Sequence, residues 1–136
     1  MSRKVAATAD GGIFDMWGDG EQTRSFLFIA ECLEGSIRLM RSDWSGPVIF
    51  GSEEMLPINQ LADLAMEIAG KQQTINYIDG PLGVRGRNSD NRLVGEKLGW
   101  KPSRPLREGW EKTYAWIVGQ VDAQRRDARH VTMLSC

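Results

Sequence analysis

The sequence is poor in the side chains that most often carry catalysis. Its 136 residues include one histidine, two tyrosines and two cysteines, and none of them falls in a Ser-His-Asp set, a zinc-protease motif or a metal cluster. His130 lies in a polar stretch near the C-terminus, where we expect a solvated side chain. Cys32 lies between apolar neighbours on a predicted helix, where a cysteine is usually a small inert hydrophobic residue. If the chain belongs to an enzyme, we expect most of the chemistry to lie elsewhere.

An excess of one charge and long apolar runs are also missing. Seventeen Lys and Arg against eighteen Asp and Glu give a net charge of −1, which argues against a nucleic-acid or anionic-membrane partner. No run approaches the roughly 20 apolar residues of a membrane span, and no apolar signal segment follows the first residues. Two cysteines, Cys32 and Cys136, cannot make a disulfide framework. We therefore expect a protein of the reducing cytoplasm.

The patterns that are present predict a single domain in which strands and helices alternate. Hydrophobic residues make up 41% and charged residues 26%, enough apolar surface for a buried core. β-prone runs predict strands at residues 13–17, 25–29, 48–50 and 74–78. Apolar periodicity predicts helices at residues 29–40, 61–69, 91–98 and 106–121, the first with Ile29, Cys32, Leu33, Ile37 and Met40 on one face. The fold class is α/β, but the segments do not form a complete doubly wound sheet, so we interpret the chain as part of a larger α/β protein.

Helix ends and tryptophans add detail to this expectation. Gly70 and Gly99 are placed to end their helices, and Asp90 is placed to cap the start of the helix that runs to Leu98. On the last helix, Trp110 lies on the apolar stripe and is expected in the core. Trp116 lies off that stripe and could cover a neighbouring domain.

Two loops carry arginines suited to an anionic ligand. One holds Gln22, Thr23 and Arg24 at the mouth of a turn, and the other holds Arg85 and Arg87 before a predicted helix N-terminus. Guanidinium groups pair bidentately with phosphate oxygens, and the helix dipole adds favourable potential. The alternative is that these polar residues only face water, with Arg85 paired to Asp79. Two such loops in a nearly neutral chain favour a small dianion over a polyanion.

Residues 80–86 have the glycine spacing of a dinucleotide-binding loop, but their surroundings argue against that function. Pro81 removes one of the N–H groups that such a loop needs, and polar residues follow where an apolar helix should begin. No strand ending in an acidic residue follows about 20 residues later. We predict a surface loop and no cofactor-binding residue.

Residues 18–26, 83–91 and 98–102 resemble the extended short-chain dehydrogenase/reductases that act on nucleotide sugars. The third segment is shared by many sugar-nucleotide epimerases and dehydratases, whereas the first two are much narrower. The resemblance covers about residues 3–121. It implies a nucleotide-sugar-binding portion at residues 1–121, followed by a polar tail at residues 122–136 that we expect to fray.

The resemblance implies an isomerase, in which a nucleotide sugar such as GDP-mannose is epimerised with NAD by a homodimer. NAD would be bound by a Rossmann half that precedes this sequence, so the isolated chain is expected to be inactive. The implied substrate-binding residues are Gln22, Thr23, Arg24, Arg87 and Lys4. Another nucleotide-sugar 4-epimerase or dehydratase, and a non-catalytic truncated remnant, stay open as alternatives.

No catalytic residue is implied within the chain. The family places its acid/base tyrosine and lysine as Tyr-x-x-x-Lys. Pro81 lies four residues after Tyr77, and Val118 lies four residues after Tyr114, so neither tyrosine matches.

Overall fold

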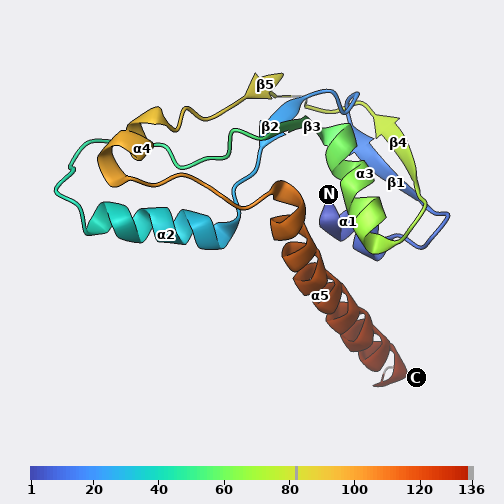
Figure 1. Ribbon diagram of the computed structural model, residues 1–136. Coiled ribbons are helices and arrows are strands. Elements are labelled where there is room, and N and C mark those ends of the chain that lie inside the picture. The colour runs from blue at the N-terminus through green and yellow to red at the C-terminus, as the bar shows by residue number, and fades with distance from the viewer. Residues whose placement is uncertain (82, 135–136) are drawn as a thin grey trace.

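The computed structural model describes the backbone of residues 1–81 and 83–134 and the side chains of residues 1–81 and 83–127. The α/β class predicted from the sequence is confirmed (Figure 1). The elements follow in the order α1 (Ser2–Ala7), β1 (Ile13–Trp17), β2 (Thr23–Ser25), α2 (Ile29–Met40), β3 (Met55–Pro57), α3 (Ile58–Ala69), β4 (Thr74–Ile78), β5 (Gly86–Arg87), α4 (Arg92–Leu98) and α5 (Leu106–Leu134).

A parallel pair of strands, β1 and β4, forms the base of a helix-packed region at the right of Figure 1. The two strands pair from Ile13 opposite Thr74 to Trp17 opposite Ile78, at the bounds that the sequence predicts. The pleat of β1 alternates, burying Phe14 and Met16. Helices α1, α3 and α5 cover this side, and the shared core consists of Val5, Ala6, Phe14, Ala62, Ala65, Tyr114 and Val121.

A three-stranded sheet in the order β3-β2-β5 lies between the two ends of the molecule. β2 is antiparallel to β3 and parallel to β5. Beneath it a second, smaller core joins Leu56 of β3 to Leu61 and Leu106 at the starts of two helices. This sheet carries Arg24 on β2 and Arg87 on β5.

Helices α2 and α4 form a separate lobe, at the left of Figure 1. Phe50 connects them, because its ring lies edge-on to Trp100 with ring centroids 5.3 Å apart. The ring also lies so close to Gly35 of α2 that a Cβ there would come within 2.7 Å of it. Glycine at this position therefore lets the loop after α2 lie against the helix.

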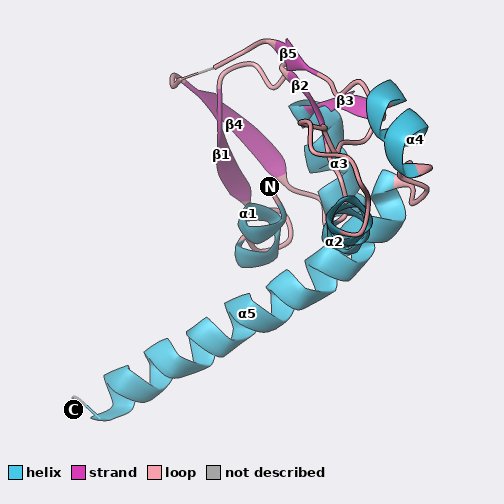
Figure 2. Ribbon diagram, turned by 90° about the vertical axis from the view of Figure 1, so that its left-hand side faces the viewer, coloured by secondary structure: helices cyan, strands magenta, loops and turns pink. Residues whose placement is uncertain are grey.

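Helix α5 is 29 residues long and projects from the body of the molecule (Figure 2). Its first half packs on α1 and α3, and Trp110 contacts both cores, as the sequence predicts. The helix continues past Val121 to Leu134, although the sequence analysis expects fraying there. In this later part Arg125 donates a hydrogen bond to the Ala7 carbonyl at 2.6 Å, which ties the helix to the end of α1. Among the described helices, none has a stretch apolar and long enough to cross a bilayer.

Two of the predicted strands are wrong, for one physical reason. A strand needs a neighbour to satisfy its ladder, and residues 48–50 have no strand beside them among the described residues, so they form a loop. Pairing of β2 ends at Ser25, because β3 is only three residues long. Phe26 then packs edge-on against Trp110, at 5.9 Å between centroids, and the chain enters α2 at Ile29.

Helix ends agree with the sequence where glycine sets the geometry. Gly70 and Gly99 both adopt the left-handed conformation, with φ of 61° and 58°. The predicted cap at Asp90 is displaced by one residue: Asn91 is the N-cap residue, and Asp90 Oδ1 accepts the backbone N–H of Arg92 at 3.0 Å. The short elements α1, β3 and β5 have too few residues to show a period, and the sequence analysis missed them.

Candidate functional site

Arg24 and Arg87, which the sequence separates by more than 60 positions, are neighbours on the three-stranded sheet. They are direct partners in the parallel register of β2 and β5. Directly paired residues on adjacent strands project from the same face of a sheet. The fold therefore brings the two arginine loops together, which the sequence analysis could only hypothesise.

The loop before β5 reaches Arg24 directly. Arg24 is half-buried, and its Nη1 donates a hydrogen bond to the Thr23 carbonyl at 2.7 Å. A Cβ on Gly83 would lie 3.9 Å from Arg24 Nη2, so this loop passes beside the guanidinium group. The Thr23 N–H donates to the Arg85 carbonyl at 2.9 Å, which ties β2 to the same loop. Arg24 is thus positioned by its strand and by the glycine-rich loop together.

Arg85 and Arg87 differ in what holds them. Arg85 Nη1 lies 2.8 Å from Asp19 Oδ2, whereas the sequence analysis considered Asp79 as its partner. The hydrogen bond from Arg85, and after it that from the Glu21 N–H, lowers the pKa of Asp19 below its usual value. Asp19 in turn raises the pKa of Arg85. The exposed Arg87 has no hydrogen bond or ion pair with any side chain in residues 1–81 and 83–127, so it is the arginine free to bind an anion.

Gln22 carries an unpartnered polar atom at the edge of this site. Its Oε1 is buried and accepts no hydrogen bond from the described part of the chain. Its backbone is fixed, because its carbonyl accepts the N–H of Ile58 at 3.1 Å. Leaving a buried acceptor unpaired costs roughly 1–3 kcal/mol. A ligand with an N–H or O–H group at this place would remove that cost.

Lys4 lies apart from the other predicted residues. It belongs to α1, and its Nζ donates to the Asp15 carbonyl in β1 at 2.5 Å. β1 belongs to the two-stranded sheet, whereas Arg24 and Arg87 belong to the three-stranded one. The structure therefore groups Gln22, Thr23, Arg24 and Arg87, and places Lys4 against the other sheet.

Asn59, at the start of α3, is a positioning residue that the sequence analysis missed. Its Nδ2 donates to the Asp19 carbonyl at 3.0 Å and to Glu21 Oε1 at 2.7 Å, which fixes the turn before β2. Tyr77 donates its hydroxyl to Asn59 Oδ1 at 3.1 Å. A Cβ on Gly20, which has a φ of 72°, would overlap the Asn59 amide, so glycine lets Asn59 lie against this turn. No local pattern marks Asn59, since its partners in the turn are 40 and 38 residues earlier and Tyr77 is 18 residues later.

Residues 80–86 do not fit a dinucleotide. Strand β5 begins at Gly86, where a dinucleotide-binding loop would continue into a helix, and Pro81 has no N–H to donate. Their arginine, Arg85, is paired with Asp19. The part of the chain that the structure describes also contains no group of three or more Asp, Glu, His or Cys placed to hold a metal ion.

An apolar cavity lies away from these residues. It has a volume of about 480 Å³ between the start of α2 and the first turns of α5, and Phe26, Phe28, Trp110 and Trp116 form much of its wall. Arg104 and Lys112 stand over the ring of Phe28 at this cavity, at 5.1 and 5.9 Å from its centroid. None of the predicted substrate-binding residues lines it.

Comparisons with known proteins place this geometry in a family. The chain is 47% identical over 131 residues to GDP-mannose 3,5-epimerase of Arabidopsis thaliana, covering 96% of the chain and 34% of that protein. It is 30% identical to UDP-glucuronic acid decarboxylase 1 of Xenopus tropicalis, covering 91% of the chain and 30% of that protein. No protein-family model matches it.

A solved structure agrees. UDP-glucuronic acid 4-epimerase of Bacillus cereus, in complex with UDP-glucuronic acid and NAD, is 25% identical. It superposes with a TM-score of 0.71 over 76% of this chain and 34% of that one. The chain belongs to the extended short-chain dehydrogenase/reductase family. The chain spans about a third of the length of the curated relatives it matches (34% for the Arabidopsis protein).

Proposed function

We propose that this chain supplies the nucleotide-sugar-binding residues of an NAD-dependent epimerase of the GDP-mannose 3,5-epimerase type. The pairing of Arg24 with Arg87 in one register carries the proposal, because it places two guanidinium groups on one face of the sheet. The identity of 47% to the Arabidopsis GDP-mannose 3,5-epimerase, against 30% to the Xenopus decarboxylase, favours GDP-mannose over a UDP-sugar.

Each predicted residue then has a role that its surroundings support. Arg87, free of ion pairs within the described residues, and Arg24, held by its own strand, would bind the two phosphates bidentately. Gln22 Oε1, buried and unpartnered there, would accept a hydrogen bond from the nucleotide or the sugar. Thr23 keeps the strand and the loop together through its backbone. Lys4 would reach the substrate only after leaving the Asp15 carbonyl.

NAD belongs to the proposed enzyme but not to these residues. The Bacillus cereus structure contains NAD, whereas the glycine-rich loop of this chain does not fit a dinucleotide. We therefore assign NAD to a part of the fold outside this chain and expect no epimerase turnover from the chain by itself. We further propose a homodimer for the whole enzyme and the cytoplasm as its location; Cys32, a free thiol, agrees with a reducing compartment.

The test is a calorimetric titration of the full chain with GDP-mannose, UDP-glucose and dTDP-glucose. We expect GDP-mannose to bind most tightly. Arg87→Ala should weaken binding about 10- to 100-fold, the scale of charge-assisted hydrogen bonds to phosphate. Arg92→Ala is the matched control, because Arg92 is an exposed arginine nearby that is paired with Asp90, and it should change the affinity less than about twofold.

Each other outcome selects a different function. Tighter binding of a UDP- or dTDP-sugar would indicate another epimerase or a dehydratase of the same family. No binding of any nucleotide sugar would indicate a non-catalytic remnant. Equal effects of Arg87→Ala and Arg92→Ala would remove the proposed phosphate site.

A further inference from the structure

The turn of residues 18–22, which leads into β2, is held from one side by Asn59. The side-chain amide of Asn59 donates to the Asp19 carbonyl at 3.0 Å and to Glu21 Oε1 at 2.7 Å. The backbone N–H of Asn59 donates to the Gly20 carbonyl at 3.0 Å. Three consecutive residues of the turn are therefore fixed by one residue of α3.

Gln22 follows these three residues directly. Its carbonyl accepts the N–H of Ile58, the neighbour of Asn59, and its buried Oε1 has no hydrogen-bond donor among the described residues. A side chain at the end of a turn keeps one place only if the backbone before it is held in one conformation. Ile58 and Asn59 supply that constraint, so the place of Gln22 Oε1 depends on α3.

Tyr77 fits the orientation that the Asn59 amide takes. An amide can turn by 180°, which exchanges its oxygen for its nitrogen. Its two partners in the turn are a carbonyl and a carboxylate oxygen, which accept hydrogen bonds and therefore require Nδ2 on that side. The Tyr77 hydroxyl donates to Oδ1 at 3.1 Å and so favours this orientation. Because Tyr77 belongs to β4, the contact joins the two-stranded sheet to the turn before β2.

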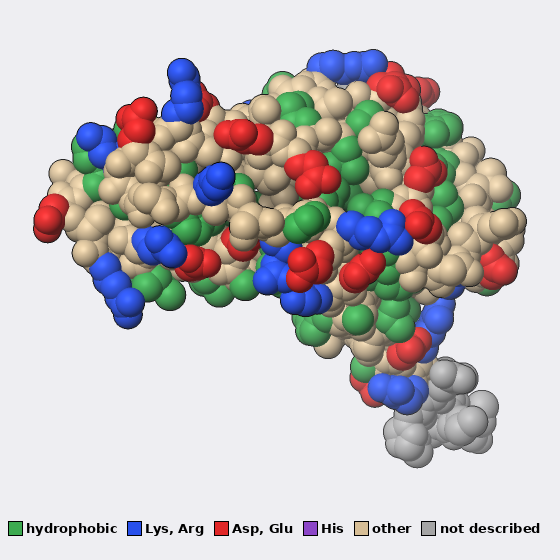
Figure 3. All heavy atoms as spheres, viewed as in Figure 1, with side chains coloured by type: hydrophobic (Ala, Val, Ile, Leu, Met, Phe, Trp, Pro, Cys, Tyr) green, Lys and Arg blue, Asp and Glu red, His purple; other side chains and the backbone are tan. Residues whose placement is uncertain are grey.

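The turn is also held from its other side, by Arg85. Asp19 and Arg85 form an ion pair, and basic and acidic side chains meet along the upper edge of the molecule beside β5 (Figure 3). The two side chains are 66% and 50% exposed, so we expect this pair to contribute little by itself. Asn59, with three hydrogen bonds to the turn, is therefore the main constraint on it.

We infer that Asn59, oriented by Tyr77, is a positioning residue that fixes Gln22 for its contact with the nucleotide sugar. This inference rests on the proposed function, in which Gln22 Oε1 accepts a hydrogen bond from the substrate. The proposed function assigns no role to Asn59 or Tyr77. Their effect on affinity passes through Gln22, because the contacts of Asn59 are with the turn that carries it.

The experiment is a double-mutant cycle on the affinity of the full chain for GDP-mannose, measured by calorimetry. Asn59→Ala and Gln22→Ala should each weaken binding about 5- to 20-fold, the scale of a few lost hydrogen bonds. The double variant should bind no more than about twofold more weakly than Gln22→Ala alone, since Asn59 acts through Gln22. A residue that only supports the fold would give additive losses instead.

Two further variants separate positioning from folding. Tyr77→Phe removes only the hydroxyl and should weaken binding about two- to fivefold. If Asn59→Ala does not fold, the cycle of Tyr77→Phe with Gln22→Ala replaces it. Asn76→Ala is the matched control, because Asn76 is an exposed asparagine on β4 whose amide donates to Asp15 Oδ1 at 2.8 Å, away from the turn. It should change the affinity less than about twofold.

Hydrogen exchange tests the turn without any ligand. The amides of residues 58 and 59 donate to the Gln22 and Gly20 carbonyls. Their exchange should be at least about fivefold faster in Asn59→Ala than in the wild type, because the side chain that holds the turn against α3 is gone. In Asn76→Ala their exchange should be unchanged.

Two results would overturn the inference. One is additive losses in the cycle, and the other is an affinity or an exchange rate that Asn59→Ala leaves unchanged. If Arg87→Ala weakens binding and Asn59→Ala does not, the inference fails alone. If Arg87→Ala has no effect, the phosphate site of the proposed function fails, and the cycle still decides the role of Asn59. If no nucleotide sugar binds the wild-type chain, both fail.

Discussion

Helices α2 and α3 have the same length and similar amphipathic patterns, yet they face opposite environments. Each spans 12 residues. α3 buries Leu61, Ala62 and Ala65 beneath α1 and α5. α2 buries Glu31 and Gly35 and leaves Leu33 and Ile37 exposed. Periodicity therefore reports that a helix has an apolar stripe, whereas what covers the stripe depends on the elements that the fold places beside it.

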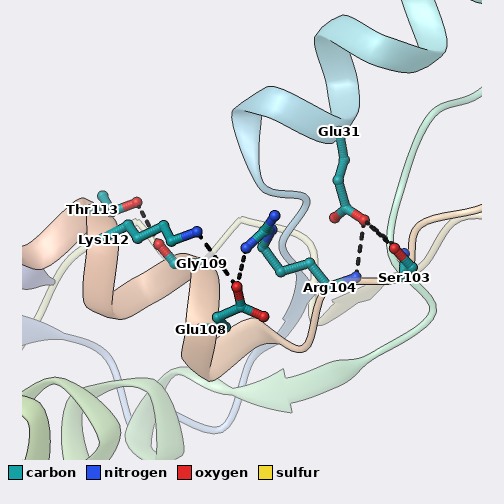
Figure 4. A network of polar contacts seen from close by, with 7 residues as sticks. All are labelled: Glu31, Ser103, Arg104, Glu108, Gly109, Lys112 and Thr113. Atoms are coloured by element: carbon teal, nitrogen blue, oxygen red, sulfur yellow. Dashed lines mark hydrogen bonds and ion pairs between the residues drawn. The ribbon is translucent and has the colours of Figure 1, made fainter.

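The regions around α3 and α2 are also held together by different kinds of contact. The region around α3 has a closed core to which α1, β1 and α5 all contribute. The α2–α4 lobe is held by local contacts, chiefly the Glu31 carboxylate (Figure 4) and the Phe50–Trp100 ring pair. The first region therefore surrounds a shared buried core, whereas α2 leaves its apolar side chains exposed.

The largest expected effect compares matched leucines on the two helices. Leu61→Asp should destabilise the chain by more than about 4 kcal/mol, because Leu61 is 3% exposed and the substitution buries a charge in the core. Leu33→Asp should change the free energy of unfolding by no more than about 1 kcal/mol, because Leu33 is exposed. Urea unfolding followed by circular dichroism measures both. If the two variants lose similar amounts of unfolding free energy, Leu33 is buried within the chain and the description of α2 as exposed is wrong.

A smaller effect tests what fixes the orientation of α2. Glu31→Gln removes the charge from an acceptor of two backbone N–H groups, and we expect a loss of about 1.5–3 kcal/mol. Glu34→Gln, on the exposed side of the same helix, loses only an ion pair to Arg38 and should cost about 0.3–0.5 kcal/mol. Hydrogen exchange at the Ser103 and Arg104 amides locates the change. Unaltered exchange there in Glu31→Gln would contradict this account.

The smallest effect concerns a surface ion pair beside α4, in the same lobe. Hydrogen bonds from the Arg92 side chain and backbone lower the pKa of Asp90 from 3.8 to about 2. A carboxyl whose pKa is lowered in the folded state adds stability above its unfolded pKa, and this is lost as the pH falls toward about 2. NMR titration of the Asp90 carboxyl should show a midpoint near 2, and Arg92→Ala should move it back toward 3.8. If the titration midpoint of Asp90 is the same in Arg92→Ala as in the wild type, the ion pair does not form in solution.

The sequence alone predicted the elements whose own residues show a clear helix or strand period or a helix-ending glycine. The strands at residues 13–17 and 74–78 and the helices α2 and α3 have clear periods, and the glycines at 70 and 99 end helices through their left-handed backbone. Residues 48–50 have an equally clear pattern and are not a strand, because pairing depends on a neighbour that the chain does not supply. The polar stretch after Val121 continues the helix, and Arg125 within it donates a hydrogen bond to the Ala7 carbonyl, a contact that no local pattern shows.

For the candidate site too, the sequence predicts some features and only the structure shows the others. The sequence alone indicated which residue types could bind an anionic sugar nucleotide, since guanidinium and amide groups at turns have that chemistry wherever they lie. Only the tertiary structure decided that Arg24 and Arg87 are register partners, that Arg85 is paired with Asp19, and that Lys4 lies on the other sheet. These outcomes depend on strand order and on side chains far apart along the chain, and no local pattern encodes such distances.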